Sequence, residues 1–444
     1  MKRRNVVLAA AGAAALLPAA VLLPLANASA GGTAVAGQRA VGAITTVRVS
    51  VGSGGEQSAA GALGGQSISA DGRLTVFTTP APDLVPGDTN IWPDVYLHDA
   101  ATGTTTRVTT GIGGQPDSYS SGAAISGDGR FVAFDSHATN LVGGDTNAAG
   151  DVFRYEVATG AVTRVSVSSG EEQARRDSSA PSLSGDGRFV AFTSGAGHLV
   201  AGDTNGRPDA FVRDTLTGRT VRASIGITGS EGDAATTEAR ISGNGRFVAF
   251  TSDASSLAPG DANGAPDVFV YDRVTGETAL VSATATGQPG DGASGNVAIS
   301  DSGRFLSFTS GSSDLVDGDT NGRADLFVRD RITGQTTRLA SGDGSVGATS
   351  ISGNGRFVAF TSTSTDLVPG DTNGKPDAFA VDRVTGAVTR TSVAADGSEM
   401  AGTLYGDVHI SGDGRSVLFS SDAANLVAGD TNERFDVFVR QFRV

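Results

Sequence analysis

A block of about 58 residues repeats seven times along this chain, and the repeat limits what the chain can fold into. The clearest part of each copy is an apolar segment such as ISGDGRFVAFTS at 125–136, and a GDTN segment follows it. The first aspartate of the GDTN segment falls at positions 88, 145, 203, 261, 319, 371 and 430. The copies therefore fill the chain from about residue 45 to its end.

Each copy contains four segments with the composition of β-strands, which in the third copy are 180–184, 188–194, 209–214 and 220–225. Gly-Asp-Gly between the first two is typical of a hairpin, because glycine accepts a positive φ. The second segment is apolar on both faces, so its sheet must be covered on both sides. Sheets packed face to face in a ring provide this burial. The repeat therefore predicts an all-β fold, a seven-bladed β-propeller with four-stranded antiparallel blades.

The chain begins and ends out of phase with the repeat. Residues 45–51 (TTVRVSV) match the fourth strand of a copy, whereas the last copy stops after its third strand at 436–440. We expect the strand at 45–51 to pair with 436–440 and to close the ring. Closure removes the open sheet edges that otherwise invite aggregation.

The S-G-D-G-R-F-V-A-F-T-S block resembles the WD40-like repeat of the TolB C-terminal propeller family, whose blades carry S-P-D-G-K-x-I-A-F. All seven copies match, although Gly replaces Pro and the GDTN insertion lengthens each unit. The resemblance implies an extracytoplasmic propeller that binds proteins or displays loops. It implies no enzyme activity, because function depends on the site and not on the fold.

The N-terminus has the composition of an export signal. Lys2, Arg3 and Arg4 precede an uncharged apolar run, and Ala28-Ser29-Ala30 matches a cleavage site. An uncleaved membrane anchor is the alternative. We interpret 1–30 as a signal peptide, 31–44 as a Gly/Ala-rich linker and 45–444 as the propeller. This predicts a secreted or envelope-associated protein that is not inserted in a membrane after cleavage.

Charge and cysteine content narrow the class of partner. Without residues 1–30 the chain carries 30 basic and 47 acidic residues, which argues against nucleic acid and anionic membranes. There is no cysteine, so disulfides and thiolate chemistry are excluded. We expect a monomer that binds a protein or a cell-surface glycan. Trp92, the only tryptophan, lies in the first GDTN segment and could contact that partner.

The GDTN segments share the pattern D-x-N-x-x-x-D, which places three oxygen-bearing side chains at positions 1, 3 and 7. The residues are Asp88, Asn90 and Asp94; Asp145, Asn147 and Asp151; Asp203, Asn205 and Asp209; Asp261, Asn263 and Asp267; Asp319, Asn321 and Asp325; Asp371, Asn373 and Asp377; and Asp430, Asn432 and Asp436. Calcium takes six to eight oxygens, often from odd positions of a loop, so the pattern predicts weak calcium sites with a Kd of about 10⁻⁴–10⁻³ M. Asp and Asn also stabilise turns without an ion, and both interpretations stay open.

The sequence contains neither H-E-x-x-H nor G-x-S-x-G, and we expect a non-enzymatic binding or scaffold module. The alternative is a secreted carbohydrate-active hydrolase or lyase that uses carboxylates near the central channel. Glu171, Glu238 and Asp407 are its candidates. In that case these acids should converge on the axis of the ring.

Overall fold

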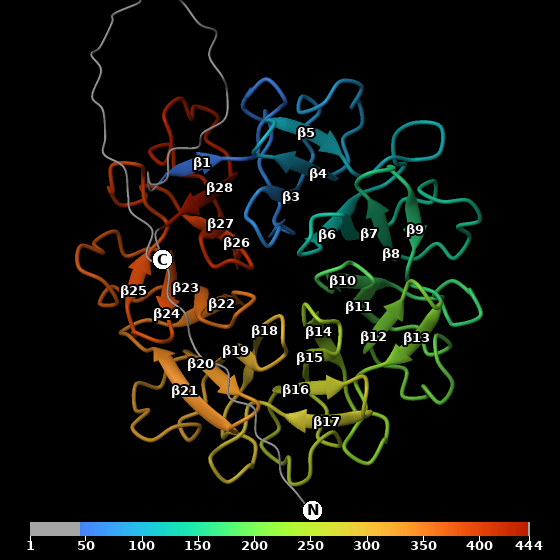
Figure 1. Ribbon diagram of the computed structural model, residues 1–444, viewed down its shortest axis with the longest axis vertical. Helices are drawn as coiled ribbons and strands as arrows, with labels where there is room; N and C mark the ends of the chain where they lie inside the picture. Colours follow the sequence, from blue (N-terminus) through green and yellow to red (C-terminus); the bar gives the residue numbers. More distant parts are fainter. Residues whose placement is uncertain (1–44, 443–444) are drawn as a thin grey trace, which may run out of the picture. The chain divides into compact units, whose positions relative to one another are not determined.

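The computed structural model describes residues 45–442, which form seven four-stranded antiparallel sheets arranged in a ring (Figure 1). The predicted seven-bladed propeller is confirmed, and no helix occurs between residues 45 and 442. None of these residues, accordingly, forms a long apolar helix of the kind that spans a membrane. The signal peptide predicted at 1–30 and the linker predicted at 31–44 lie outside the described residues.

The first strand of each blade lies nearest the axis and the fourth lies at the outer edge (Figure 1). Blades 1 and 2 contain β2 (Ser67–Ile68), β3 (Leu74–Thr79), β4 (Asp94–Asp99), β5 (Thr104–Arg107), β6 (Ser120–Ile125), β7 (Phe131–Ser136), β8 (Asp151–Glu156) and β9 (Val162–Arg164). Blades 3 and 4 contain β10 (Ser178–Leu183), β11 (Phe189–Ser194), β12 (Asp209–Asp214), β13 (Arg219–Arg222), β14 (Thr236–Ile241), β15 (Phe247–Ser252), β16 (Asp267–Asp272) and β17 (Glu277–Leu280). Blades 5 and 6 contain β18 (Ser294–Ile299), β19 (Phe305–Ser310), β20 (Asp325–Asp330), β21 (Gln335–Ala340), β22 (Val346–Ile351), β23 (Phe357–Ser362), β24 (Asp377–Asp382) and β25 (Val388–Arg390). Blade 7 contains β26 (Leu404–Ile410), β27 (Ser416–Ser421), β28 (Asp436–Gln441) and β1 (Thr46–Arg48).

Blade 7 is completed by both ends of the described chain, as the phase of the repeat predicts. Strand β1 pairs antiparallel with β28, with Thr46 opposite Arg440 and Arg48 opposite Phe438. The Ser50 hydroxyl then donates to a carboxylate oxygen of Asp436 at 2.5 Å. The pairing leaves blade 7 with the same four strands as the others.

The core lies between and within the blades. In every blade an aromatic ring of the second strand stacks on one of the third strand, with ring centroids 5.5–5.9 Å apart. Phe192 and Phe211 form this pair in blade 3, and both are fully buried. The double-sided burial expected for the second strand is therefore present. Stacked pairs of this kind add about 0.5–1.5 kcal/mol each beyond the area they bury.

The turns between first and second strands form a ring of backbone hydrogen bonds around the axis. Each of the seven blade interfaces carries one, such as Gly185 N to Gly243 O at 2.8 Å. A Cβ added at Gly185 would lie 3.0 Å from the Gly243 carbonyl oxygen, so this close approach requires glycine. We call this side of the ring the hairpin face.

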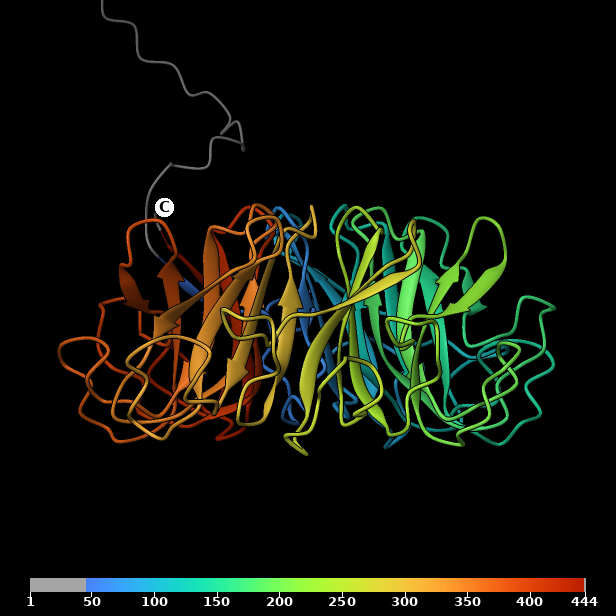
Figure 2. The same cartoon turned by 90° about the horizontal axis from the view of Figure 1, so that it is seen from below.

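The opposite side carries the longer loops and is called the loop face here (Figure 2). It contains the GDTN loops, which join the second strand to the third, and the blade-connecting loops, which join the fourth strand to the next blade. Both loop types lie there because all neighbouring strands of a blade are antiparallel.

Candidate functional site

The last aspartate of each D-x-N-x-x-x-D pattern is the first residue of a third strand. All seven are completely buried: Asp94, Asp151, Asp209, Asp267, Asp325, Asp377 and Asp436. Their carboxylates therefore lie beneath the loop face and not on it. The structure brings the three residues of one pattern together within each blade, but it keeps the seven patterns in seven separate loops.

The asparagine at the third position holds the turn in every blade. Its side-chain oxygen accepts a hydrogen bond from the backbone N–H two residues later, at 2.7–3.2 Å. Its amide donates to the buried aspartate at 2.9–3.4 Å. In blade 3 the Asn205 amide also donates to the carbonyl of Gly232, which lies in the blade-connecting loop. The asparagine thus joins two loops as well as capping its own turn.

An arginine of the fourth strand lies between the two aspartates in six of the seven blades. Its guanidinium nitrogens are 2.9–3.8 Å from the carboxylate oxygens. The six residues are Arg48, Arg107, Arg164, Arg222, Arg338 and Arg390. In these blades a guanidinium occupies the space between the carboxylates where a cation bound by both would lie.

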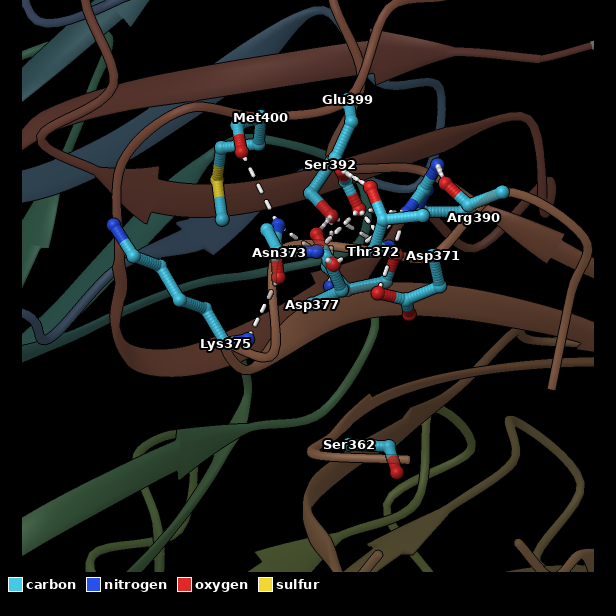
Figure 3. Close-up of polar contacts among 12 residues, drawn as sticks. Ser362, Asp371, Thr372, Asn373, Lys375, Asp377, Arg390, Ser392, Glu399 and Met400 are labelled. Atoms are coloured by element: carbon cyan, nitrogen blue, oxygen red, sulfur yellow. Dashed lines mark hydrogen bonds and ion pairs between the residues drawn. The ribbon is translucent and has the colours of Figure 1, made fainter. Parts of the chain in front are cut away.

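A glutamate from the blade-connecting loop joins the cluster in blades 3 and 6. Asp203, Asp209 and Glu231 offer oxygens within 4.8 Å of one another, and Asp371, Asp377 and Glu399 do the same. Figure 3 shows the second group with Arg390, whose Nη1 is 2.7 Å from Glu399. These acidic groups could hold a metal ion. Calcium at the 21 predicted residues stays a prediction.

In the blade 3 cluster the pKa values of the two aspartates are raised, whereas the pKa of the glutamate is lowered. Burial, together with the neighbouring Asp209, raises the pKa of Asp203 to about 6. Burial also acts on Glu231, but hydrogen bonds from Thr204 and Arg222 outweigh it and lower the pKa of Glu231 to about 2. Both oxygens of Asp203 lack a hydrogen-bond donor within residues 45–442, although its side chain is only 1% exposed. Arg222 is therefore the main compensation for its charge.

Blade 4 is the exception, because Leu280 stands where the other blades have the arginine. It pairs with Phe269 in the same register that places Arg222 opposite Phe211 in blade 3. Asp267 retains hydrogen bonds from Ser282 (2.6 Å) and Asn263 (3.0 Å). Burial nevertheless raises the pKa of Asp267 to about 6.

A cavity of about 530 Å³ lies on the axis and is lined by the first strands. Most of the lining is small, but Glu238, Arg240, Asp301, Asp407 and His409 bring charge and hydrogen-bonding groups into it.

The expected convergence of three acids on the axis holds for Glu238 and Asp407 and is wrong for Glu171. Glu171 lies in the connecting loop between blades 2 and 3, where it pairs with Arg213 of β12. The backbone of Glu171 has a φ of +65°, so the chain turns at this residue of the loop.

Six large apolar side chains are exposed on the loop face of blades 7, 1 and 2, and we call them the apolar patch. They are Leu63, Ile91, Trp92, Ile112, Tyr119 and Tyr405, with exposed fractions of 39–81%. Trp92 was a candidate from the sequence, and Tyr405 lies in a variable segment between blades where recognition was also expected. The others could not be recognised, because nothing in a single sequence tells which loop residues stay uncovered.

Backbone contacts place the members of this patch in neighbouring loops. Leu63 N donates to Thr78 O of blade 1, and the ring of Tyr405 approaches Gly64, the residue after Leu63. Ser120, next to Tyr119, donates its N–H to Pro93 O, next to Trp92, at 2.9 Å. The loop that carries Ile112 also contacts the first GDTN loop, because the Gln115 amide donates to Thr89 Oγ1 at 2.9 Å.

These features define a seven-bladed β-propeller whose loop face is held by buried ion pairs. No family model and no curated protein matches the chain.

Solved structures share the fold. The β-propeller domain of the Trilobed protease from Pyrococcus furiosus is 10% identical over 86% of this chain and 96% of its own, with a TM-score of 0.53. An oligogalacturonate lyase from Vibrio parahaemolyticus is 11% identical over 85% and 88%, with a TM-score of 0.51. TolB from Acinetobacter baumannii is 18% identical over 72% of this chain, which spans 64% of TolB, with a TM-score of 0.40. The seven four-stranded blades that the resemblance to TolB-like propellers implies are confirmed by the sheet arrangement of this chain.

The buried ion pairs predict a large effect of removing one arginine. Arg222→Leu copies the natural residue of blade 4 but leaves the carboxylates of Asp203, Asp209 and Glu231 together. We expect a loss of about 3–5 kcal/mol in the free energy of unfolding, because the partners of a broken buried pair stay buried. Thermal and denaturant unfolding measure it.

Arg246→Leu is the matched control, since Arg246 pairs with Asp272 at 2.7 Å but is 44% exposed. We expect about 1 kcal/mol or less for an exposed pair. Equal losses in the two variants would contradict a special role of the buried arginine.

Blade 4 lacks the arginine, so introducing one there should stabilise the protein. The raised pKa of Asp267 means that the folded state binds a proton more readily than the unfolded chain, so this group removes stability as the pH rises from about 4 through 6. Leu280→Arg should lower that pKa only in part, because Asp94 keeps a pKa of about 6 beside Arg107. We therefore expect a gain of about 1 kcal/mol at about pH 7.5, since one pKa unit corresponds to about 1.4 kcal/mol. The gain should shrink towards about pH 4.5. Unfolding monitored by circular dichroism across this range measures it.

Leu280→Met, which adds no charge, should keep the pH dependence of the wild type. A gain from Leu280→Arg that does not depend on pH would argue against the electrostatic explanation.

Proposed function

We propose that this chain is an exported, non-enzymatic binding module that recognises a protein or a cell-surface glycan through its loop face. The observation that carries the proposal is the apolar patch on blades 7, 1 and 2. Monomeric soluble proteins rarely leave large apolar side chains gathered on one surface unless that surface binds something. Trp and Tyr also supply much of the binding energy in known interfaces.

The loops that carry the patch are held in place, which reduces the entropy lost on binding. The Asn432 amide donates to Ser58 O at 3.0 Å, and Gln57 donates to Asp430 at 2.8 Å. Both bonds fix the connecting loop that precedes Leu63. Tyr405 is supported by the ring of Phe435, with centroids 5.1 Å apart. The patch is therefore a pre-formed surface.

The net charge of the chain and its N-terminal signal limit the kind of partner that we expect. The excess of acidic residues disfavours nucleic acid and anionic membranes, and the N-terminal signal directs the chain to the cell envelope or the medium. The outer edge strands of the blades are only three to six residues long, which leaves little free edge for self-association and supports a monomer.

The alternative, a hydrolase or lyase, has one observation in its favour: Glu238 and Asp407 line the same cavity. However, Oε1 of Glu238 already accepts hydrogen bonds from Thr251 at 2.7 Å and from Val297 N at 3.0 Å. These contacts hold the side chain against the wall between blades 4 and 5. We therefore prefer the binding module.

The patch predicts how binding responds to substitution. Trp92 is the only tryptophan, so its emission reports contacts at the patch without a label. We expect the emission to shift when soluble cell-wall glycan fragments or isolated envelope proteins are added. Ile112→Ser with Tyr405→Ser should weaken the interaction about 10-fold or more, as for central interface residues.

The control is Leu216→Ser with Val274→Ser, because these side chains are 73% and 71% exposed in turns of the hairpin face. This control should bind as the wild type does. Equal weakening in both double variants, or no emission change with either material, would refute the use of the patch.

Calcium is a further expectation within this proposal, and blades 3 and 6 are the places to test it. Binding there requires the arginine to leave the carboxylates, which agrees with a weak site. We expect millimolar calcium to raise the melting temperature relative to EDTA, and about 1.4 kcal/mol corresponds to one site at ten times its Kd. Glu231→Gln with Glu399→Gln removes the third carboxylate and should abolish the shift. Coincident melts of the wild type in EDTA and calcium would rule calcium out.

A further inference from the structure

At one position of the first strands that line the central cavity, two of the seven blades carry a different kind of residue from the other five. Each first strand places one residue there, directly before the conserved Ile or Leu, and we call these seven residues the middle ring. They are Ser67, Ala124, Ser182, Arg240, Ala298, Ser350 and His409, and all seven line the cavity. Five are small, so the propeller folds well with serine or alanine at this position. Arg240 and His409 need another explanation.

The three serines of the middle ring use their hydroxyl oxygens as acceptors, which leaves their hydroxyl hydrogens available to donate. Each hydroxyl oxygen accepts a backbone N–H from the following blade: Ser67 from Ile125 at 3.3 Å, Ser182 from Ile241 at 3.1 Å and Ser350 from Ile410 at 3.1 Å. The hydroxyl hydrogens have no acceptor within residues 45–442. They are free to donate to a ligand in the cavity.

The Arg240 guanidinium has no hydrogen bond or ion pair to any residue between 45 and 442, although the residue is half-buried. Burial lowers the pKa of His409 to about 4; the charge of Asp407 opposes this shift and that of Arg240 adds to it. His409 is therefore neutral at neutral pH and does not compete with Arg240 for an anion. No carboxylate of residues 45–442 lies within ion-pair distance of this guanidinium, although Glu238, Asp301 and Asp407 line the same cavity. A carboxylate is the planar group that a guanidinium binds best.

Acidic groups lie on both sides of the middle ring. Asp407 and Glu238 lie two residues earlier on the strands of His409 and Arg240, towards the loop face. Asp301 lies at the hairpin face, where six blades have Gly or Ala and where its carboxylate fits only because Gly243 and Gly353 lack a Cβ. Asp301 therefore narrows this end of the cavity. These carboxylates repel multiply charged anions and accept hydrogen bonds from hydroxyl groups.

We propose that the central cavity is a binding site for a small sugar acid, a ligand with one carboxylate and several hydroxyl groups. Arg240 holds the carboxylate, the serines of the middle ring donate to its oxygens, and Asp407 accepts hydrogen bonds from the hydroxyl groups. The cavity volume of about 530 Å³ is within the range of small-molecule sites. This site is separate from the apolar patch, so it does not depend on the function proposed above.

Calorimetric titration of the wild-type protein with D-glucuronate, D-glucose and acetate tests this site. We expect glucuronate to bind about 10- to 100-fold more tightly than glucose, which lacks the carboxylate, because a hydrogen bond to a charged group contributes about 1.5–3 kcal/mol. Acetate, which lacks the hydroxyl groups, should also bind more weakly than glucuronate. Equal affinities for glucuronate and glucose, or no binding of glucuronate, would overturn the proposal.

Arg240→Met should reduce glucuronate affinity to that of glucose, and Arg240→Lys should keep part of it. Arg246→Met, a change of the adjacent exposed arginine outside the cavity, should bind as the wild type does. Unchanged glucuronate affinity in Arg240→Met would overturn the role of Arg240. The wild-type comparison of the three ligands decides the proposal even if a variant does not fold. Trp92 emission should not respond to glucuronate, so this test and that of the patch succeed or fail separately.

Discussion

A fully buried aspartate begins the third strand of every blade, and the order of the loop face depends on its hydrogen bonds. A buried carboxylate is costly unless donors surround it. In blade 3, Asp209 accepts from Ser224 of the loop that follows β13 and from Asn205 of the GDTN loop, and Asn205 also holds the blade-connecting loop. One carboxylate therefore joins the GDTN loop to the blade-connecting loop, directly through Ser224 and through Asn205. The loop face is built on this buried contact.

The fold could be predicted because the seven copies act as an alignment within one chain. The spacing defined the blade, and the extra strand at 45–51 defined how the ring closes, as the pairing of Thr46 with Arg440 shows. Residues that recur at the same position of all seven copies could also be recognised from the sequence. The invariant Asn, for example, was open to two interpretations, a turn residue or a calcium ligand, and its side chain caps the turn in every copy.

The arginine between the carboxylates was not recognised, although the signal was present. Arg222 follows Asp203 by 19 residues and lies on another strand, so its proximity depends on the register of β12 with β13. An arginine in a strand of an acidic protein also has no special meaning by itself. Comparing the fourth strands of all copies would have shown it in six of seven, with Leu280 as the exception. Glu171 was misplaced for a related reason, because the path of a long loop does not follow from the repeat.

The same comparison separates what the fold requires from what it only tolerates. Positions that are identical in all blades, such as the buried Asp, are explained by folding, since each blade needs them. At the middle ring five blades have Ser or Ala, so folding does not demand Arg240 or His409 there. A guanidinium that has no direct ion pair, at a position where folding accepts Ser or Ala, is available to an anionic group of a ligand. In a repeat protein the residues that break the symmetry of the axis are therefore stronger indicators of a ligand than the residues that obey it.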